Sequence, residues 1–309
     1  MSKRKSKKTQ SQQVKELQSK LEKGIDQIMS ENGWGKWLTY QSIFHTYSFA
    51  NTVLIAQQMP EATRVAGFHT WKKAKRQVLK GSKSIRVLAP IFFTKMVEDE
   101  NGEETEESYR RYKAVPVFDV SQTDGDELPE QPFYTVSIHG DEDNGLFEAL
   151  KGFSESQGCP VSIEPYQFGS SLGFYSPTDH SITVKNGSIA RQAHVLAHEV
   201  AHSLLHKGDA EADGRNPAHL SRGIKELEAE SVAFILCNAW GIDPGVSSFG
   251  YIADWSGKET QKELKLSAKR IAEASKKVLK SIGTPKNPTL QDSQKAAKKL
   301  LKSIGTPKS

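Results

Sequence analysis

Residues 193–206 read AHVLAHEVAHSLLH, and this stretch decides how the C-terminal half of the chain is interpreted. Its apolar residues recur at the spacing of an amphipathic helix, so we predict a helix over 189–206. His198 and His202 lie four positions apart, where two side chains project from one helix face and can reach the same ion. The five-residue motif His-Glu-x-x-His also occurs by chance, but its place in an amphipathic helix favours a metal site.

The residue types of this motif match those of a catalytic zinc site. Neutral imidazole suits Zn²⁺, and a catalytic zinc takes three protein ligands and leaves one position open for water. We therefore predict a zinc hydrolase of the zincin type in which His198 and His202 are ligands and Glu199 is the catalytic base. His194 and His206 extend the same face by one turn in each direction. Because His206 would lie about 6 Å further along the helix axis than His202, we expect both outer histidines at the pocket rim.

The third ligand is sought in the next predicted helix, over 224–240. Residues 226–230 read ELEAE, which places Glu226 and Glu230 one turn apart on one face, whereas Glu228 points away. We predict Glu226 as the ligand and Glu230 as the residue that orients a ligand histidine. The reverse assignment of these two glutamates stays open.

Two segments of this half resemble a known family. Residues 174–206 read FYSPTDHSITVKNGSIARQAHVLAHEVAHSLLH, and residues 226–234 read ELEAESVAF. They resemble the ImmA/IrrE-type zincin domain, over about residues 145–245. The resemblance implies a metallopeptidase domain with His198, His202 and Glu226 as metal ligands. A zinc fold that has lost turnover is the alternative, although the base Glu199 is present.

The N-terminal half carries a basic run beside Trp71. Seven lysines and arginines lie within fifteen positions, namely Lys72, Lys73, Lys75, Arg76, Lys80, Lys83 and Arg86. Lysine and arginine neutralise phosphates, and an aromatic ring such as that of Trp71 stacks on unpaired bases. Taken alone, the run is explained equally well as a solvated basic face.

A second resemblance covers this half. Residues 47–51 (YSFAN), 67–90 (GFHTWKKAKRQVLKGSKSIRVLAP) and 117–123 (VFDVSQT) are similar to the N-terminal domain of ArdC-type antirestriction proteins. The resemblance spans about residues 13–125 and implies that this domain binds single-stranded DNA through the Trp71–Arg86 segment. ArdC-type proteins join such a domain to a zincin domain in the same order.

The remaining patterns outline an α+β protein. In the N-terminal half we expect helices over 13–29, 41–58 and 68–78 and strands over 85–93 and 114–120. In the C-terminal half we expect a helix near 144–157, strands near 161–167 and 181–184, and a helix over 262–282. Between the first two strands lies an acidic run, made of Glu98, Asp99, Glu100, Glu103, Glu104, Glu106 and Glu107. We interpret it as a solvated hairpin tip rather than a cation site, because its spacing matches no calcium loop.

These patterns predict the following order of parts. They are a disordered basic arm (1–12), a DNA-binding domain (13–125), a linker (126–143), a zincin-like domain (144–255) and a basic helical tail (256–309). The tail contains a duplicated segment, KKVLKSIGTPK at 276–286 and KKLLKSIGTPK at 298–308.

The net charge of +5 is unevenly distributed along the chain. Residues 1–12 carry five basic side chains and no acid, and residues 256–309 carry a net charge of +10, so the rest is acidic. Basic ends of this kind bind nucleic acid or are solvated tails. The two cysteines, Cys159 and Cys237, fit a reducing compartment and are expected in the core. Since we find neither a membrane span nor a secretory signal, we expect a cytoplasmic protein without a membrane partner.

The sequence thus predicts a single-stranded-DNA-binding zinc metallopeptidase that protects incoming plasmid or phage DNA from restriction. Its expected partners are single-stranded DNA and an unidentified protein substrate, and we expect the DNA to stimulate proteolysis by competing for the basic tail. One alternative is a non-catalytic protein that coats single-stranded DNA and uses zinc structurally. Another is a regulatory protease that cleaves a repressor and whose first domain binds protein.

Overall fold

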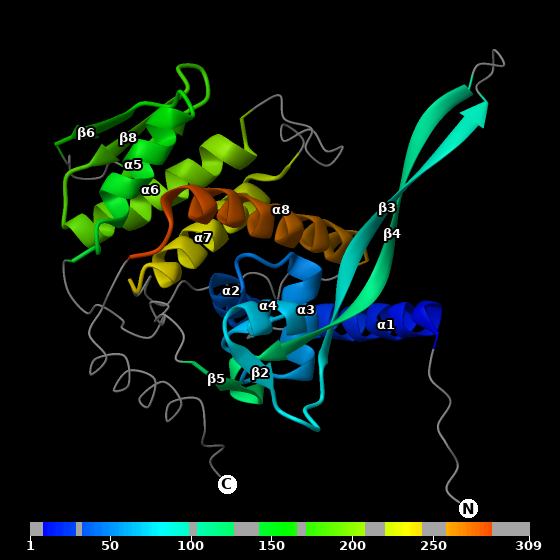
Figure 1. The fold of residues 1–309 in the computed structure, drawn as a ribbon. Helices are drawn as coiled ribbons and strands as arrows, with labels where there is room; N and C mark the ends of the chain where they lie inside the picture. Colours follow the sequence, from blue (N-terminus) through cyan, green and yellow to red (C-terminus); the bar gives the residue numbers. More distant parts are fainter. Residues whose placement is uncertain are drawn as a thin grey trace, which may run out of the picture. The chain divides into compact units, whose positions relative to one another are not determined.

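The computed structural model describes residues 9–28, 33–98, 104–126, 142–165, 171–207, 220–242 and 258–285 (Figure 1). These residues form an α+β protein, as predicted. Most of the basic arm, most of the predicted linker and the second copy of the duplicated segment lie outside the described residues. Among the described helices, none combines the length and apolar character that a bilayer crossing requires.

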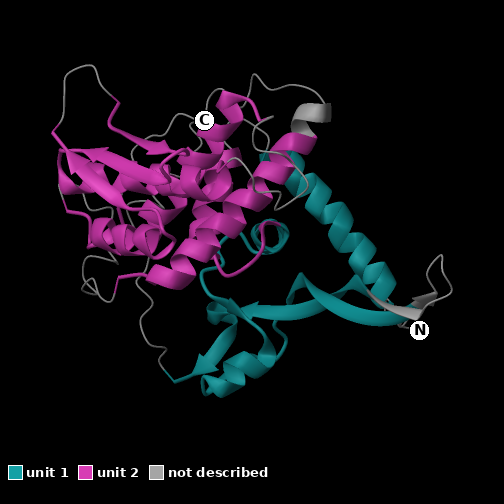
Figure 2. Cartoon of the chain, turned by 90° about the horizontal axis from the view of Figure 1, so that it is seen from above, with its two compact units in different colours: residues 1–28, 50–128 teal, residues 29–49, 129–309 magenta. Residues whose placement is uncertain are grey.

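The chain divides into two compact units, which Figure 2 shows in different colours. Unit 1 comprises residues 1–28 and 50–128, and unit 2 comprises residues 29–49 and 129–309. The predicted boundaries had placed residues 29–49 in the N-terminal domain. They group with unit 2 because helix α2 (Gly33–Ile43) buries Trp34, whose Nε1 donates to Ser231 Oγ at 3.0 Å on helix α7 (Arg222–Ala239).

Unit 1 is built around a long antiparallel hairpin. Strands β3 (Ile85–Glu98) and β4 (Glu104–Asp119) pair over fourteen positions, from Ile85↔Val117 to Glu98↔Glu104. Helix α1 (Gln10–Ile28) packs its apolar stripe on the base of this hairpin, through a cluster that includes Leu17, Leu54 and Ala114. The unit is completed by α3 (Phe49–Gln58), β1 (Val65–Ala66), α4 (Phe68–Lys73), β2 (Arg76–Val78), η1 (Val120–Gln122) and β5 (Thr123–Gly125).

Three predicted elements of this region need correction. The single helix over 41–58 is wrong, because α2 ends at Ile43, a turn follows, and α3 begins at Phe49. The helix over 68–78 ends at Lys73, since Lys75 adopts a left-handed φ of 56° and the chain turns back into β2, which pairs with β5. The two long strands extend well beyond 93 and before 114, so most of the acidic run lies in their paired ends rather than in the tip alone.

Unit 2 places a small sheet and several helices around α6 (Ile189–Leu205). The sheet has the order β6-β8-β7, with β6 (Val161–Glu164) parallel and β7 (Gly173–Ser176) antiparallel to β8 (Ser181–Lys185). Helices α5 (Leu146–Ser156), α6 and α7 lie close to their predicted positions, and β7 is a strand that the sequence pattern did not predict. Both cysteines are buried and free, in agreement with the prediction.

Helix α8 (Lys258–Ile282) corrects the interpretation of the C-terminal tail. Its buried apolar residues recur at helical spacing and pack against the rest of unit 2; they are Leu264, Ala268, Ile271, Ala272, Ala274, Val278 and Leu279. Near its end, Gly283 O accepts a hydrogen bond from Trp240 Nε1 at 3.1 Å. The first half of the predicted basic tail is therefore part of the core of unit 2, and five of its lysines are exposed, namely Lys262, Lys269, Lys276, Lys277 and Lys280.

Candidate metal centre

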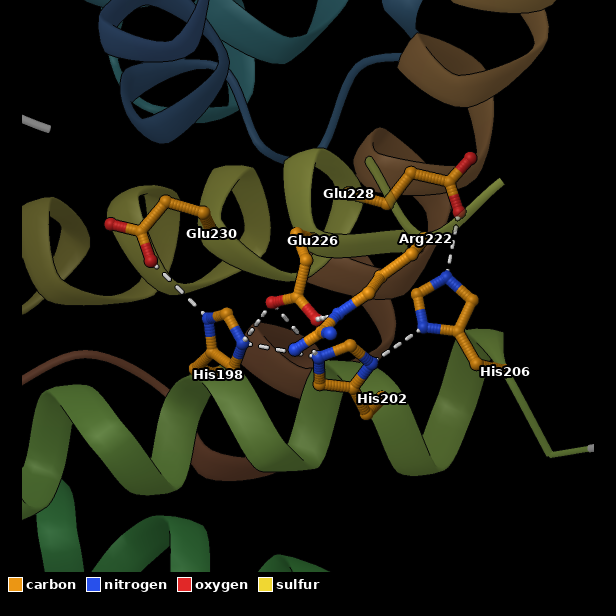
Figure 3. Close-up of polar contacts among 7 residues, drawn as sticks. All are labelled: His198, His202, His206, Arg222, Glu226, Glu228 and Glu230. Carbon is orange, nitrogen blue, oxygen red and sulfur yellow. Dashed lines mark hydrogen bonds and ion pairs between the residues drawn. The ribbon is translucent and has the colours of Figure 1, made fainter. Parts of the chain in front are cut away.

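Three side chains from α6 and α7 converge on one point (Figure 3). The Nε2 atoms of His198 and His202 lie 3.1 Å apart. Glu226 Oε2 lies 3.3 Å from His198 Nε2 and 3.8 Å from His202 Nε2. A tetrahedral zinc ion with ligands at about 2.0–2.1 Å separates its ligand atoms by roughly 3.3 Å, so the three atoms have the spacing of a zinc ligand set.

The packing of α6 explains why these side chains meet. On the face opposite the histidines, α6 buries small and branched side chains, so the helix is held on both sides; they are Ala193, Leu196, Ala197, Val200 and Ala201. Across from the histidines, α7 buries its own apolar stripe beside α6. The four-residue spacing on α6 and the position of Glu226 in the first turns of α7 then bring the ligand atoms together.

Glu199 lies beside this cluster and is only 8% exposed. Burial raises the pKa of the Glu199 carboxyl, and the nearby His198 and a hydrogen bond from the Tyr175 backbone offset part of that rise. Strand β7 can approach α6 so closely because residue 173 is glycine; a Cβ there would meet Val195 Cγ1 at 2.5 Å. The carboxylate is thus held at the cluster by a strand edge, in a position that suits a general base.

Glu230 holds the other nitrogen of His198. Its Oε2 lies 3.2 Å from His198 Nδ1, and its Oε1 lies 3.4 Å from His194 Nε2. Burial lowers the pKa of His198, but the hydrogen bond with Glu230 and the surrounding carboxylates outweigh it, and the net pKa is raised. When Nε2 serves a metal, Nδ1 must carry the proton, and Glu230 is placed to accept it. The structure thus puts Glu226 among the ligand atoms and Glu230 behind His198.

His206 does not lie at the pocket rim as predicted. Helix α6 ends at Leu205, and the His206 side chain turns inward, where it is 8% exposed. Its Nδ1 lies 2.8 Å from His202 Nδ1, and its Nε2 lies 3.0 Å from Glu228 Oε2. Sequence reasoning missed this arrangement because the helix was assumed to continue through His206.

Glu228 is the second residue whose role the sequence did not predict. It is fully buried, and Arg270 of α8 lies near it, with NH2 3.6 Å from Glu228 Oε2. The same Arg270 nitrogen donates to the Leu205 carbonyl at the end of α6. One signal was present in the sequence, since a glutamate between Leu227 and Ala229 on an apolar helix needs a buried partner.

Burial and the neighbouring histidines lower the pKa of His202 to about 3. Burial also lowers the pKa of His206, against the opposing effect of Glu228. Both rings are therefore neutral at physiological pH, and neutral imidazole is the form that binds a metal ion or accepts a hydrogen bond at nitrogen.

The structure separates the predicted DNA contacts into three groups. Trp71 is only 3% exposed and its Nε1 donates to Phe118 O at 2.9 Å, so the prediction that this ring stacks on bases is wrong. Arg76 binds Thr123 and the Asp126 carbonyl, which ties β2 to β5, and the half-buried Arg86 donates to Gln13 Oε1 at 3.3 Å. The remaining predicted contacts are exposed; they are Lys72, Lys73, Lys75, Lys80 and Lys83.

Comparisons with known proteins bear on both units. Residues 7–118 match the family described as the N-terminal domain of anti-restriction factor ArdC. An uncharacterized protein of Bacillus anthracis is 26% identical over 252 residues, which cover 70% of this chain and 42% of that protein. This chain therefore spans less than half the length of that relative.

Two crystal structures of the antirestriction protein ArdC from the R388 plasmid are also similar. The metal-free structure is 25% identical with a TM-score of 0.45, over 81% of this chain and 85% of that chain. The Mn(II)-bound structure is 21% identical with a TM-score of 0.46, over 85% of this chain and 96% of that chain.

Proposed function

We propose that this protein is an antirestriction protein that binds single-stranded DNA and carries a zinc metallopeptidase site, because residues 7–118 match the family described as the N-terminal domain of anti-restriction factor ArdC. The observation that supports the peptidase is the convergence of His198 Nε2, His202 Nε2 and Glu226 Oε2 beside the buried Glu199. The proposed setting is plasmid or phage DNA that enters a cell as a single strand.

The donor set fits zinc. Two neutral imidazoles and one carboxylate form a three-ligand set that leaves a fourth position for water, as in catalytic zinc sites. When bound, Zn²⁺ would polarise a peptide carbonyl and lower the pKa of the attacking water. His198, His202 and Glu226 would hold the ion, and Glu230 would fix the ring of His198.

Glu199 would carry the proton through the reaction. As general base it accepts a proton from the attacking water, and as general acid it returns a proton to the amine that leaves. Its pKa, raised by burial and partly offset by His198, brings the carboxyl closer to the range in which both transfers are efficient. The Tyr175 backbone holds it in place during these transfers.

The test of this function separates metal binding from turnover. The purified full-length protein is expected to contain zinc by elemental analysis and to cleave an unstructured substrate such as casein. Glu199→Gln should keep the zinc and lose cleavage, because only the base is changed. If Glu199→Gln cleaves as well as the parent protein, the peptidase proposal is wrong. If it protects incoming DNA equally well without cleavage, the protein acts by coating.

The same assay assigns the third ligand. Glu226→Ala should remove the metal, because two imidazoles alone bind zinc poorly. Glu230→Ala should retain measurable binding with an affinity about 10- to 100-fold lower, because it only orients His198. The opposite ranking would exchange the roles of the two glutamates.

A further inference from the structure

The β3–β4 hairpin of unit 1 has a buried base and an exposed arm. At the base, Ile85, Val87 and Ala114 are buried against the helices of the unit. Beyond the base, residues 89–96 and 108–113 form a two-stranded arm, called here the ribbon, that Figure 1 shows as a twisted pair of strands. Its large exposed side chains are Phe92, Phe93, Met96, Tyr109 and Tyr112, and Phe92 is the most exposed at 69%. Single exposed apolar residues are ordinary, but this many along one ribbon indicate a binding surface.

The register assigns these side chains to two faces. Residues directly opposite each other in an antiparallel pair share a face. The pairs Pro90↔Tyr112 and Phe92↔Arg110 therefore share one face. The pairs Ile91↔Arg111, Phe93↔Tyr109 and Ala89↔Lys113 share the other. Each face thus combines aromatic rings with basic residues.

Direct contacts agree with this assignment. The Arg110 guanidinium lies 5.5 Å from the ring centre of Tyr112 on the first face. The Arg111 guanidinium lies 5.8 Å from the ring centre of Phe93 on the second face. Stacked guanidinium and aromatic groups form a flat, cationic surface, which offers ring faces to unpaired bases and positive charge to phosphates.

The charge of the hairpin changes along its length, from basic residues on the ribbon to acidic residues toward the tip. Lys95, Arg110, Arg111 and Lys113 are exposed on the ribbon, and the acidic positions begin only at Glu98 on one strand and end at Glu107 on the other. A polyanion is attracted to the basic part and repelled by the acidic end. The ribbon covers about 20 Å of strand at 3.3–3.4 Å per residue, which is long enough for several nucleotides.

We propose that the first face of the ribbon is the surface on which single-stranded DNA binds, with bases stacked on Phe92 and Tyr112 and a phosphate at Arg110. The inference rests on the proposed function, since it locates the DNA contact of unit 1. The aromatic residues of the ribbon take the stacking role that was predicted for Trp71, which is buried and donates a hydrogen bond to Phe118 O. The exposed lysines at 72–83 become a rival surface that the experiment compares directly.

The first test measures the affinity of the full-length protein for a labelled oligodeoxythymidylate by fluorescence anisotropy. Phe92→Leu keeps an apolar side chain of similar size and removes the ring, so the Kd should rise about 5- to 100-fold. Phe92→Tyr keeps the ring and should bind like the parent, which shows that the site tolerates substitution. The matched control is Phe68→Leu, at a 51% exposed phenylalanine of α4 next to the lysine run, and it should leave the Kd unchanged.

The second test measures the salt dependence of binding. Arg110→Gln should lower the slope of log K against log salt by about 0.7, the value for one phosphate contact on a single strand. Lys113→Gln, on the opposite face of the ribbon, should change the slope less. The double variant Lys72→Gln/Lys73→Gln should also change it less than Arg110→Gln. Loss of binding in this double variant and in Phe68→Leu, with Phe92→Leu unaffected, would place the DNA on α4 and overturn the inference.

The outcomes separate this inference from the proposed function. If the parent protein does not bind the oligonucleotide, the DNA part of the proposed function fails. If it binds and every ribbon variant binds equally well, the function stands and the ribbon assignment is wrong. If Phe92→Leu instead changes the mass measured by analytical ultracentrifugation and leaves DNA binding intact, the ribbon is a contact between copies of the chain, which also overturns the inference.

Discussion

His202, His206 and the buried Glu228 form a hydrogen-bonded series in which each member limits the tautomer of the ring before it. If His202 binds a metal through Nε2, its Nδ1 carries the proton and donates to His206 Nδ1 at 2.8 Å. His206 must then carry its own proton on Nε2, which donates to Glu228 Oε2 at 3.0 Å. The buried carboxylate therefore acts on the metal ligand through an intermediate imidazole, as a carboxylate does directly in many zinc sites.

This series predicts that His206 affects metal affinity although it is not a ligand. His206→Ala should weaken zinc binding about 10- to 100-fold, because His202 loses the partner that fixes its tautomer and ring orientation. The measurement is a competition titration against a chromophoric chelator. His194→Ala is the matched control, since His194 lies 3.4 Å from Glu230 Oε1 and is not among the three converging metal-binding side chains, so it should change the affinity less. Equal affinities of the parent and His206→Ala would refute the series.

At the scale of elements, β7 packs close to α6 because residue 173 is a glycine and has no side chain between them. A Cβ on residue 173 would meet Val195 Cγ1 at 2.5 Å and the Thr183 carbonyl at 3.0 Å. Gly173→Ala should therefore cost about 1–3 kcal/mol of stability and displace the strand whose Tyr175 backbone holds Glu199. We expect casein cleavage to fall further than zinc content. Gly187→Ala, whose Cβ would find only Arg191 Cδ at 3.7 Å, should leave both unchanged.

The docking of α8 depends on an ion pair that is buried on both sides. Arg270→Met leaves the Glu228 charge without its cation and should destabilise the protein by about 3 kcal/mol in urea unfolding. Adding Glu228→Gln should recover much of that loss, because the double variant buries no unpaired charge. A double variant that is less stable than Arg270→Met would show that the pair is not coupled.

For the whole molecule, the parts predicted well from the sequence are those that local spacing determines. His198 and His202 meet because they are four residues apart on a helix, and Glu226 joins them from the next helix along the chain. By contrast, the indole nitrogen of Trp71 donates to the Phe118 carbonyl, 47 positions away in the sequence. The indole nitrogen of Trp34 donates to the Ser231 hydroxyl, at a sequence separation of 197. Local spacing of residue types along the sequence does not predict such long-range contacts.

Residues 94–96 and 108–113 of the ribbon were not predicted as strand, for a related physical reason. Strands are recognised by one apolar and one polar face, and this pattern arises when one face is buried. Residues 94–96 and 108–113 extend beyond the core, so exposed aromatic and basic residues occur on both faces instead. The presence of aromatic and basic residues on both faces made these strands hard to predict, and it also indicates a binding surface.

The last prediction concerns the coupling of DNA binding to proteolysis, and the structure changes how it must be tested. Residues 256–285 include α8, whose buried Leu264, Ile271, Val278 and Leu279 contribute about 1.5–3 kcal/mol each. Their summed loss of about 6–12 kcal/mol is comparable to the 5–15 kcal/mol by which a domain is typically stable, so deletion of residues 256–309 should unfold unit 2. Deletion of residues 286–309 alone should keep the zinc content and the unfolding midpoint.

The shorter deletion still removes the whole second copy of the duplicated basic segment, at 298–308, together with Lys286 and Lys295. If single-stranded DNA stimulates cleavage by competing for these lysines, the truncated protein should cleave casein without DNA at a rate closer to the stimulated rate. DNA can shift the equilibrium between an inactive and an active arrangement only if it binds the active arrangement more tightly. The truncated protein should therefore bind the oligonucleotide at least as tightly as the full chain does. This comparison is made at high salt, where the charge lost with the tail matters less. Stimulation that survives the deletion unchanged would mean that the coupling does not use the tail, and equal cleavage by the full chain with and without DNA would mean that there is no coupling.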